Sequence, residues 1–362
     1  MLQLASPGGR SGDRQARGAA AARVVLWAMF LVPALACADS SAPSNGSTGV
    51  DTAAGDTAPE EAPEESGADT AAGDTAPEDV HEETGADTGP APDAHPTVRF
   101  EGGTFTMGSP EDEEYRQSDE QQHARTLTRP FLIGRDEVTQ ALAEELLGHN
   151  PAADGVDSYG ERCDEGGVDP GLPVVCLTWY DAVNLANALS TRDGLDPAYV
   201  VDGDEVTWDR DSPGWRLPTE GEWEFVARAG TDDQYGVTAD ADEVCTYANV
   251  ADVTATANTG TNYPFACDDG AWTLTPPGSY APTPHGVVDQ LGNVYEWVWD
   301  RGGDYPAAPE DDYAGPEAGD ERVRRGGGWH SGLPYARPAY RGRTPPDGTL
   351  KTLGMRLARD AR

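Results

Sequence analysis

Positive charge is scarce in this chain. Its 362 residues include 25 Lys and Arg against 64 Asp and Glu, which gives a formal net charge of −39 at pH 7. A surface this acidic repels phosphate backbones, so nucleic acid is not an expected partner. The same surplus of carboxylates favours cations, including calcium, which prefers oxygen ligands.

A long apolar run is also missing. The most apolar stretch near the N-terminus, residues 24–36, is shorter than the roughly 20 residues that span a bilayer. It lies between four arginines and Cys37, an arrangement that predicts a signal peptide over residues 1–37. The small residues before Cys37 fit two kinds of processing. In lipoprotein processing Cys37 becomes the lipidated N-terminus, whereas ordinary A-x-A cleavage leads to simple secretion.

The location of the protein follows from this segment. Lipidation at Cys37 predicts an exported lipoprotein of the outer membrane or cell surface, which contacts the membrane only through that anchor. Simple secretion predicts a periplasmic or secreted protein instead.

Residues 38–96 contain no Lys, no Arg and no aromatic residue. A ten-residue segment, 51–60, recurs verbatim as 69–78, and the composition is dominated by Ala, Pro, Thr, Gly and acids. Such a segment cannot bury enough apolar surface to offset chain entropy, so it is predicted to be a disordered acidic tether. An acidic binding tail is the alternative. Residues 97–362 remain as the folded domain.

Cysteine is rare, with five in the chain. Neither a C-x-x-C pair nor a Cys/His cluster is present, so the sequence does not indicate zinc. Apart from Cys37 there are four cysteines, an even number, as expected for an exported protein: Cys163, Cys176, Cys245 and Cys267. Three pairings are possible, and pairing of sequence neighbours is the simplest.

The folded domain combines strand and helix patterns. Alternation of apolar and polar residues predicts a strand with a turn over residues 100–109 and further strand over 125–133. A helix is expected to begin after Thr139 and stop at Gly148. Capping boxes predict two more helices, one beginning after Thr178 with Asp181, and one beginning after Thr219 with Glu222 and ending at Gly230. Short helices among short strands and long polar connections indicate an α+β domain with much irregular structure.

Seven short motifs occur in order along residues 98–360. They are Gly102-Gly103-x-Phe105-x-Met107-Gly108-Ser109, Glu137-Val138-Thr139, Pro173-Val-x-x-Leu-Thr-Trp179-x-Asp181-Ala182, Arg216-Leu-Pro-Thr-Glu-x-Glu-Trp-Glu224, Leu291-Gly-Asn-Val-Tyr-Glu-Trp297, Arg325-Gly-Gly-x-Trp329 and Gly354-Met-Arg356. The set resembles the formylglycine-generating enzyme (sulfatase-modifying factor) family. The resemblance implies that family's variant of the C-type lectin-like fold.

The resemblance also implies what the chain should not do. In the family's oxidases a cysteine pair spaced C-x4-C follows the Arg-Gly-Gly-x-Trp motif, binds copper and activates oxygen. Ser331 and Ala336 stand at those positions here. Copper(I) needs soft thiolates, so copper-dependent formylglycine formation is not expected, and no catalytic residue is assigned. His330 and Ser331 are not expected to form a hydrolytic pair, because adjacent strand residues point to opposite faces; both are expected at a loop surface.

Calcium is the cofactor that the resemblance implies, in a structural role. One ligand set would be Asp289, the carbonyls of Gly292 and Val294, and Glu296. The other would be Asn249, the Val250 carbonyl, Asp269 and the Ala271 carbonyl. For Asp289 and Glu296 the alternative is that they only hydrogen-bond loop amides.

A ligand groove is expected around the altered cysteine positions. Its predicted lining residues are Trp329, Ser331, Tyr335, Arg337 and Arg341. A role as internal framework, and not in catalysis, is expected for Arg216, Glu222, Arg325 and Arg356. Buried Arg–carboxylate pairs of this kind fix irregular loops. The leading hypothesis is an exported surface module that binds a peptide, a protein or a small molecule. An enzyme of the family with altered chemistry and a structural envelope component are the alternatives.

Overall fold

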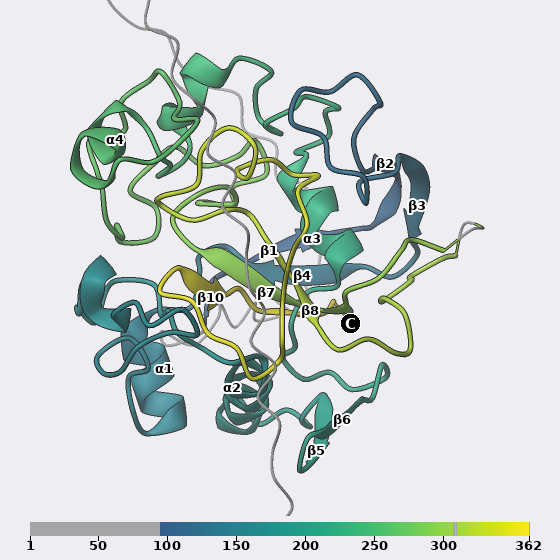
Figure 1. Ribbon diagram of the computed structural model, residues 1–362. Coiled ribbons are helices and arrows are strands. Elements are labelled where there is room, and N and C mark those ends of the chain that lie inside the picture. Colours follow the sequence, from purple (N-terminus) through teal and green to yellow (C-terminus); the bar gives the residue numbers. More distant parts are fainter. Residues whose placement is uncertain (1–94, 307, 309, 362) are drawn as a thin grey trace, which may run out of the picture. The chain divides into compact units, whose positions relative to one another are not determined.

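The computed structural model describes residues 95–306, 308 and 310–361 (Figure 1). The predicted signal peptide, Cys37 and nearly all of the predicted tether lie outside these residues. The described residues all belong to one unit, Glu83–Arg362. In this part of the chain no helix is long and apolar enough to cross a membrane.

A four-stranded sheet runs through the middle of this unit. Its order is β10 (Leu353–Met355), β7 (Tyr295–Arg301), β8 (Arg322–Arg325) and β9 (Gly342–Thr344). Strands β10 and β7 are parallel, and the other two pairs are antiparallel. In Figure 1, α1 (Gln140–Leu147) and α2 (Trp179–Arg192) lie on one side of this sheet and α4 (Val253–Thr259) lies on the other.

Three smaller sheets surround it. One has the antiparallel order β1 (Thr97–Phe100), β4 (Phe131–Gly134) and β11 (Ala358–Asp360). The others are antiparallel pairs, β2 (Gly103–Met107) with β3 (His123–Leu127), and β5 (Tyr199–Asp202) with β6 (Glu205–Trp208). The strand with a turn expected in residues 100–109 is confirmed, as β2 preceded by the turn that follows β1. The continuous strand over 125–133 is wrong, because Pro130 has no amide hydrogen for a ladder and the Thr128 amide bonds to Asp312 instead.

The predicted helix starts are confirmed. Thr139 caps α1, which ends at Gly148 with a left-handed φ of 78°. Thr178 and Asp181 form a capping box at α2. Helix α3 (Glu220–Ala227) begins with the box of Thr219 and Glu222. It ends at Ala227 and not at Gly230. The sequence did not predict α4 or the 3-10 helices η1 (Cys163–Gly166) and η2 (Ala241–Thr246).

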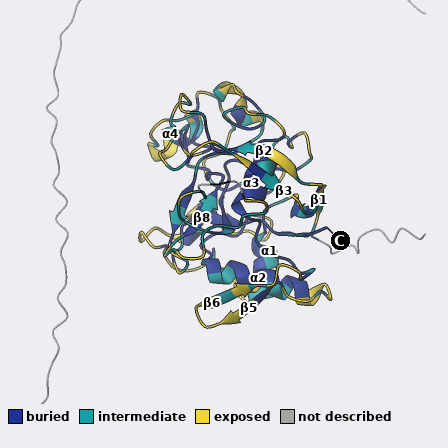
Figure 2. Cartoon of the chain, turned by 90° about the vertical axis from the view of Figure 1, so that its right-hand side faces the viewer, coloured by how far each residue is buried: buried dark blue, intermediate teal, exposed yellow. Residues whose placement is uncertain are grey.

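Tryptophans join α2 to the central sheet. Trp179 and Trp297 are fully buried, and their indole N–H groups donate to the carbonyls of Val298 and Leu177, each at 3.0 Å. Each ring thereby buries a large apolar area while its polar atom stays satisfied. Figure 2 shows α2 and α3 mostly dark blue where they face the interior, with exposed residues gathered in outer loops and in the β5–β6 pair.

Both disulfides of the simplest pairing are present, Cys163–Cys176 and Cys245–Cys267. The first closes a loop rich in Gly and Asp, whereas the second closes a loop rich in Ala, Thr and Asn. The predicted framework is also confirmed. Arg216 donates to both carboxylate oxygens of Glu222 at 2.7 Å, and buried Arg325 pairs with Glu224.

Candidate functional site

The segment after β8 makes a tight turn that brings two distant positions together. Gly326 and Gly327 have φ angles of +96° and +81°, a region that suits glycine. A Cβ atom on Gly327 would lie 3.1 Å from the Cβ of Ser331 and 3.4 Å from the Cβ of Ala336. The positions expected for a thiol pair are therefore neighbours in space, but they hold a hydroxyl and a methyl group.

Ser331 has a structural role in this turn. Its buried hydroxyl accepts a hydrogen bond from the Gly328 amide at 2.9 Å and donates to the Tyr295 hydroxyl at 3.1 Å. Both capacities of the hydroxyl group are thereby engaged. Ser331 thus holds the turn against the start of β7.

His330 and Ser331 face the same cleft, contrary to the expected divergence across a strand. The segment is a turn, so strand alternation does not apply, and neither residue is an exposed loop residue. Burial and, next, the charge of Lys351 lower the pKa of His330 to about 4. Within the described residues no hydrogen bond joins His330 to Ser331, so the geometry does not form a nucleophilic pair.

The cleft has a volume of about 510 Å³, and tyrosine is its most frequent lining residue. The full lining is Asp157, Tyr159, Glu161, Thr261, Asn262, Tyr263, Tyr295, Arg324, His330, Ser331, Tyr335, Tyr340, Leu350, Lys351 and Thr352. Three rim tyrosines expose much of their surface, Tyr159 at 79%, Tyr263 at 61% and Tyr335 at 41%. Exposed tyrosines offer rigid contact area together with a hydrogen-bonding group, which is typical of binding surfaces.

Three of the five residues predicted for the groove do not line this cleft. Arg337 is fully buried and pairs with Glu120 at 2.7 Å, and Arg341 is buried and pairs with Glu220 at 2.6 Å. Trp329 is 2% exposed. The prediction was wrong for the arginines because an arginine inside the protein takes carboxylate partners. Ser331 and Tyr335 are the residues of the predicted set that do line the cleft.

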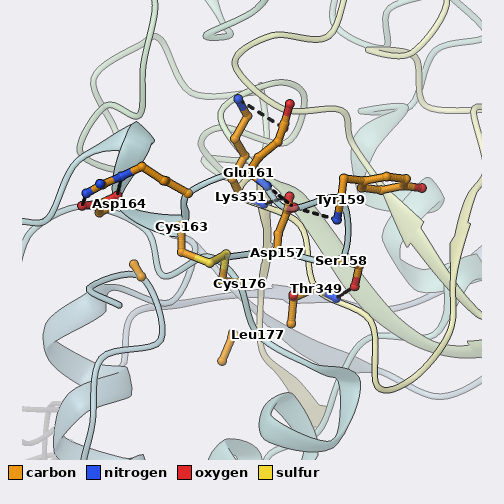
Figure 3. Close-up of a disulfide and its surroundings, with 12 residues drawn as sticks. Asp157, Ser158, Tyr159, Glu161, Cys163, Asp164, Cys176, Leu177, Thr349 and Lys351 are labelled. Atoms are coloured by element: carbon orange, nitrogen blue, oxygen red, sulfur yellow. Dashed lines mark hydrogen bonds and ion pairs between the residues drawn. A yellow bond between two sulfur atoms is a disulfide. The ribbon is translucent and has the colours of Figure 1, made fainter. Parts of the chain in front are cut away.

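Backbone contacts hold the cleft walls. Asp157 accepts hydrogen bonds from the amides of Tyr159 and Glu161, and its second oxygen accepts from the amide of Lys351 (Figure 3). The Lys351 ammonium group pairs with Glu161 at 3.3 Å. Cys163, whose disulfide to Cys176 appears beside these residues, directly follows this loop. One carboxylate and one disulfide thus order the wall that carries Tyr159.

The rim that carries Tyr263 depends on a close contact between two backbone segments. A Cβ on Gly332 would lie 2.1 Å from the carbonyl oxygen of Tyr263, and the Leu333 amide donates to that same carbonyl at 2.9 Å. Only glycine permits this contact. The loop after α4 is thereby attached to the turn that carries Ser331.

The first predicted calcium set is partly engaged by a protein cation. Arg356 donates to Glu296 at 2.8 Å and to the Asp289 carbonyl at 3.3 Å, and Trp223 donates to Glu296 at 2.7 Å. Glu296 is therefore already balanced in charge, but by a guanidinium and an indole and not by the loop amides of the alternative; Asp289 does accept a loop amide, from Gly278 at 2.6 Å. Asp289 keeps one buried oxygen without a partner, and burial raises its pKa to about 6.

The second predicted set fits a hard cation better. The side-chain oxygen of Asn249 is buried without a partner. Asp269 accepts from the amides of Val250 and Ala271, each at 2.8 Å, and burial raises its pKa to about 6. Asp252, which the sequence did not single out, lies close to Asp269. The nearby Cys245 is in a disulfide and offers no thiolate. Oxygen donors of this kind suit calcium.

Most cleft residues were missed in the sequence. Tyr159, Tyr263, Tyr340 and Lys351 come from loops far apart in the chain, and no local pattern connects them. Arg324 directly precedes the Arg-Gly-Gly motif, which was the one available signal.

Similarity to known proteins agrees with this architecture. The chain is 30% identical over 248 residues to the chaperone protein LppX of Paenibacillus barcinonensis, covering 63% of this chain and 80% of that protein. It is 31% identical over 214 residues to the formylglycine-generating enzyme of Streptomyces coelicolor, covering 56% of this chain and 57% of that enzyme.

Two solved structures share the fold. Variable protein 1 of Treponema denticola superposes with a TM-score of 0.60 at 28% identity, covering 73% of this chain and 95% of that one. PvdO from Pseudomonas aeruginosa gives 0.58 at 30% identity, covering 73% and 94%. The predicted α+β fold of the formylglycine-generating enzyme type is thereby confirmed. Residues 83–361 match the model of the sulfatase-modifying factor enzyme 1-like domain, and the chain belongs to that family.

Proposed function

We propose that this chain is a ligand-binding member of its family that lacks formylglycine oxidase activity. The observation that carries the proposal is the pair Ser331 and Ala336, which lie side by side without a thiol between them. Ser331 is also engaged by Tyr295 and Gly328, so its hydroxyl supports the turn. The tyrosine-lined cleft then serves binding, and a peptide is the ligand that its size and polar lining favour. The relative named as a chaperone supports a role in handling other proteins.

Copper(I) binding tests the loss of oxidase chemistry. The purified protein should not bind copper(I) tightly, and it should leave a cysteine-containing sulfatase peptide unmodified by mass spectrometry. The double variant Ser331→Cys with Ala336→Cys, kept reduced, should gain copper(I) affinity, because two thiolates would then stand against Gly327. Each single variant is the matched control. Conversion of the peptide cysteine to an aldehyde by the unaltered chain would support the alternative of an enzyme with altered chemistry.

The N-terminal segment supports an exported protein held at the outer membrane or cell surface through lipidated Cys37. Detergent partitioning of the full chain, lost in Cys37→Ser, is the expected result. Recovery of an unacylated mature chain from the medium would indicate simple secretion.

Calcium is proposed as a structural ion at the Asn249 and Asp269 set. A ligand that binds only the folded state stabilises it by about 2.7 kcal/mol at 100 times its Kd. Calcium should therefore raise the melting temperature, and magnesium should substitute poorly because it demands tighter geometry. Asp269→Asn should blunt the response, whereas Glu296→Gln tests the first set. If chelation leaves the melting curves of all three proteins unchanged, both calcium assignments fail.

A further inference from the structure

One arginine of the cleft differs from the framework arginines. Arg324 lies on β8, is partly buried and lines the cleft. Its Nε donates to the Thr344 hydroxyl at 2.9 Å. Among the described residues its two terminal nitrogens have neither a hydrogen bond nor a carboxylate partner. The domain is rich in carboxylates, yet no described carboxylate pairs with this arginine of the cleft.

The side chain is nevertheless held in place. Its guanidinium carbon lies 4.4 Å from the centre of the Tyr295 ring, within the range of a cation–π contact. Across the sheet, Arg324 is paired with Gly342, and a Cβ there would lie 2.5 Å from Nη1 and 2.8 Å from the guanidinium carbon. Tyr295, Thr344 and the absent side chain at Gly342 together fix the orientation of the guanidinium.

The acids of the cleft have other partners. Both oxygens of Asp157 accept backbone amides, and Glu161 pairs with Lys351. Lys351 also pairs with Glu165 at 2.9 Å. The charge of Lys351 is thus balanced by acids of its own wall, and that of Arg324 is not.

From this arrangement we infer that Arg324 is the receptor for a carboxylate group on a peptide ligand in the cleft, an inference that rests on the proposed binding function. A planar guanidinium with two free terminal nitrogens matches a carboxylate in a bidentate geometry. The tyrosine rim then contacts the rest of the peptide.

The charge of the domain selects against a more anionic ligand. Its folded part has a formal charge near −27, counted from residues 97–362. Repulsion from this field grows with ligand charge, whereas a single arginine balances one negative charge. A peptide with one carboxylate at the contact point therefore fits better than a phosphate dianion. The carboxylate comes from an Asp or Glu side chain or from the peptide C-terminus.

Three pools of N-acetylated heptapeptides, random at the other positions but with Asp and Glu left out of them, separate these sources. The first has a central Gln and an amidated end, the second a central Glu and an amidated end, and the third a central Gln and a free carboxyl end. Each pool is equilibrated with the immobilised full chain, and retained peptides are quantified by mass spectrometry. We expect at least one carboxylate pool to be retained about tenfold better than the first.

Matched variants test the residue. Arg324→Gln should reduce retention of the carboxylate pools to the level of the first pool. Gly342→Ala should weaken it while keeping the charge, because the new methyl group displaces the guanidinium. Arg99→Gln, which removes an equal charge at an exposed site outside the cleft, should have no effect. Melting curves of all variants establish that they fold.

The outcomes distinguish peptide binding by the cleft from the role of Arg324 as a carboxylate receptor. If all three pools are retained equally, or if Arg324→Gln leaves retention unchanged, the cleft binds peptides but the carboxylate receptor is wrong. If no pool is retained by the unaltered chain, peptide binding and the receptor both fail.

Discussion

Arg324 and Arg325 are neighbours on β8, yet they belong to different parts of the molecule. Arg325 is fully buried, pairs with Glu224 and donates to the Tyr340 carbonyl. Arg324 points into the cleft, where its terminal nitrogens have no protein partner among the described residues. Successive strand residues face opposite sides of a sheet, which separates the two environments. One residue type thus serves as internal framework on one face and, in the proposed function, as the receptor for a ligand on the other.

The two arginines differ in whether their positive charge has a carboxylate partner within the protein. In the interior, Arg216, Arg325, Arg337, Arg341 and Arg356 each have a carboxylate within reach. A buried charge without a partner would cost several kcal/mol, so these pairs are obligatory for the fold. The rim of the cleft is exposed to solvent, so a charge there can stay without a protein partner. Availability of this kind is what distinguishes a candidate binding residue from a framework residue of the same chemistry.

The largest expected effect comes from breaking an interior pair. Arg325→Ala leaves Glu224 buried without this partner and should lower the free energy of unfolding by about 3–5 kcal/mol. Arg324→Ala should cost less than about 1 kcal/mol, because its charge is solvated. Urea denaturation of both variants measures the difference. Equal destabilisation by the two substitutions would contradict the separation into framework and cleft.

Removal of the disulfide beside the cleft should have the next largest effect. Cys163→Ala with Cys176→Ala opens a loop with a sequence separation of 13 and should cost about 2–4 kcal/mol. It should also reduce peptide retention, since the wall that carries Tyr159 directly precedes Cys163. The matched variant lacking Cys245 and Cys267 should lose stability with a smaller change in retention. An intact binding profile in the first variant would show that the wall does not need this disulfide.

The smallest expected effect is a pH dependence of opposite sign in the two regions. Burial and the neighbouring charge of Glu220 raise the pKa of Asp300 to about 7. The folded state then binds the proton more tightly than the unfolded state, so this group's contribution to stability falls as pH rises from about 4 to 7. Asp300→Asn keeps an acceptor for the Glu220 amide and should remove a decline of about 1–3 kcal/mol.

His330 should behave in the opposite way. Its pKa is lowered to about 4, so the unfolded state binds more protons between about pH 4 and 6.5, and stability rises with pH over that window. Denaturation curves of Asp300→Asn and His330→Gln at pH 4.5 and 7.5 compare the two. Parallel pH profiles for both variants and the unaltered chain would contradict the opposite pH dependences expected of Asp300 and His330.

Local patterns in the sequence determined where three helices begin. Thr178 with Asp181, and Thr219 with Glu222, place oxygen acceptors where helix amides lack partners, which depends only on nearby residues. Ordered motifs indicated the fold, and the pairing of cysteines close in sequence was the simplest choice. The sequence also established that positions 331 and 336 contain no thiol.

Only the tertiary structure decided which side chains share a site. The sequence predicted Arg337 as a groove residue. In the structure it is buried, because it pairs with Glu120, which is far away in the chain. The position of Arg324 beside the Arg-Gly-Gly motif gave no indication of its surroundings, which are formed by Tyr295, Thr344 and Gly342 from other strands. The reason is physical: capping and turn formation are local, whereas the partner of a charge is set by whichever distant segment the fold brings beside it.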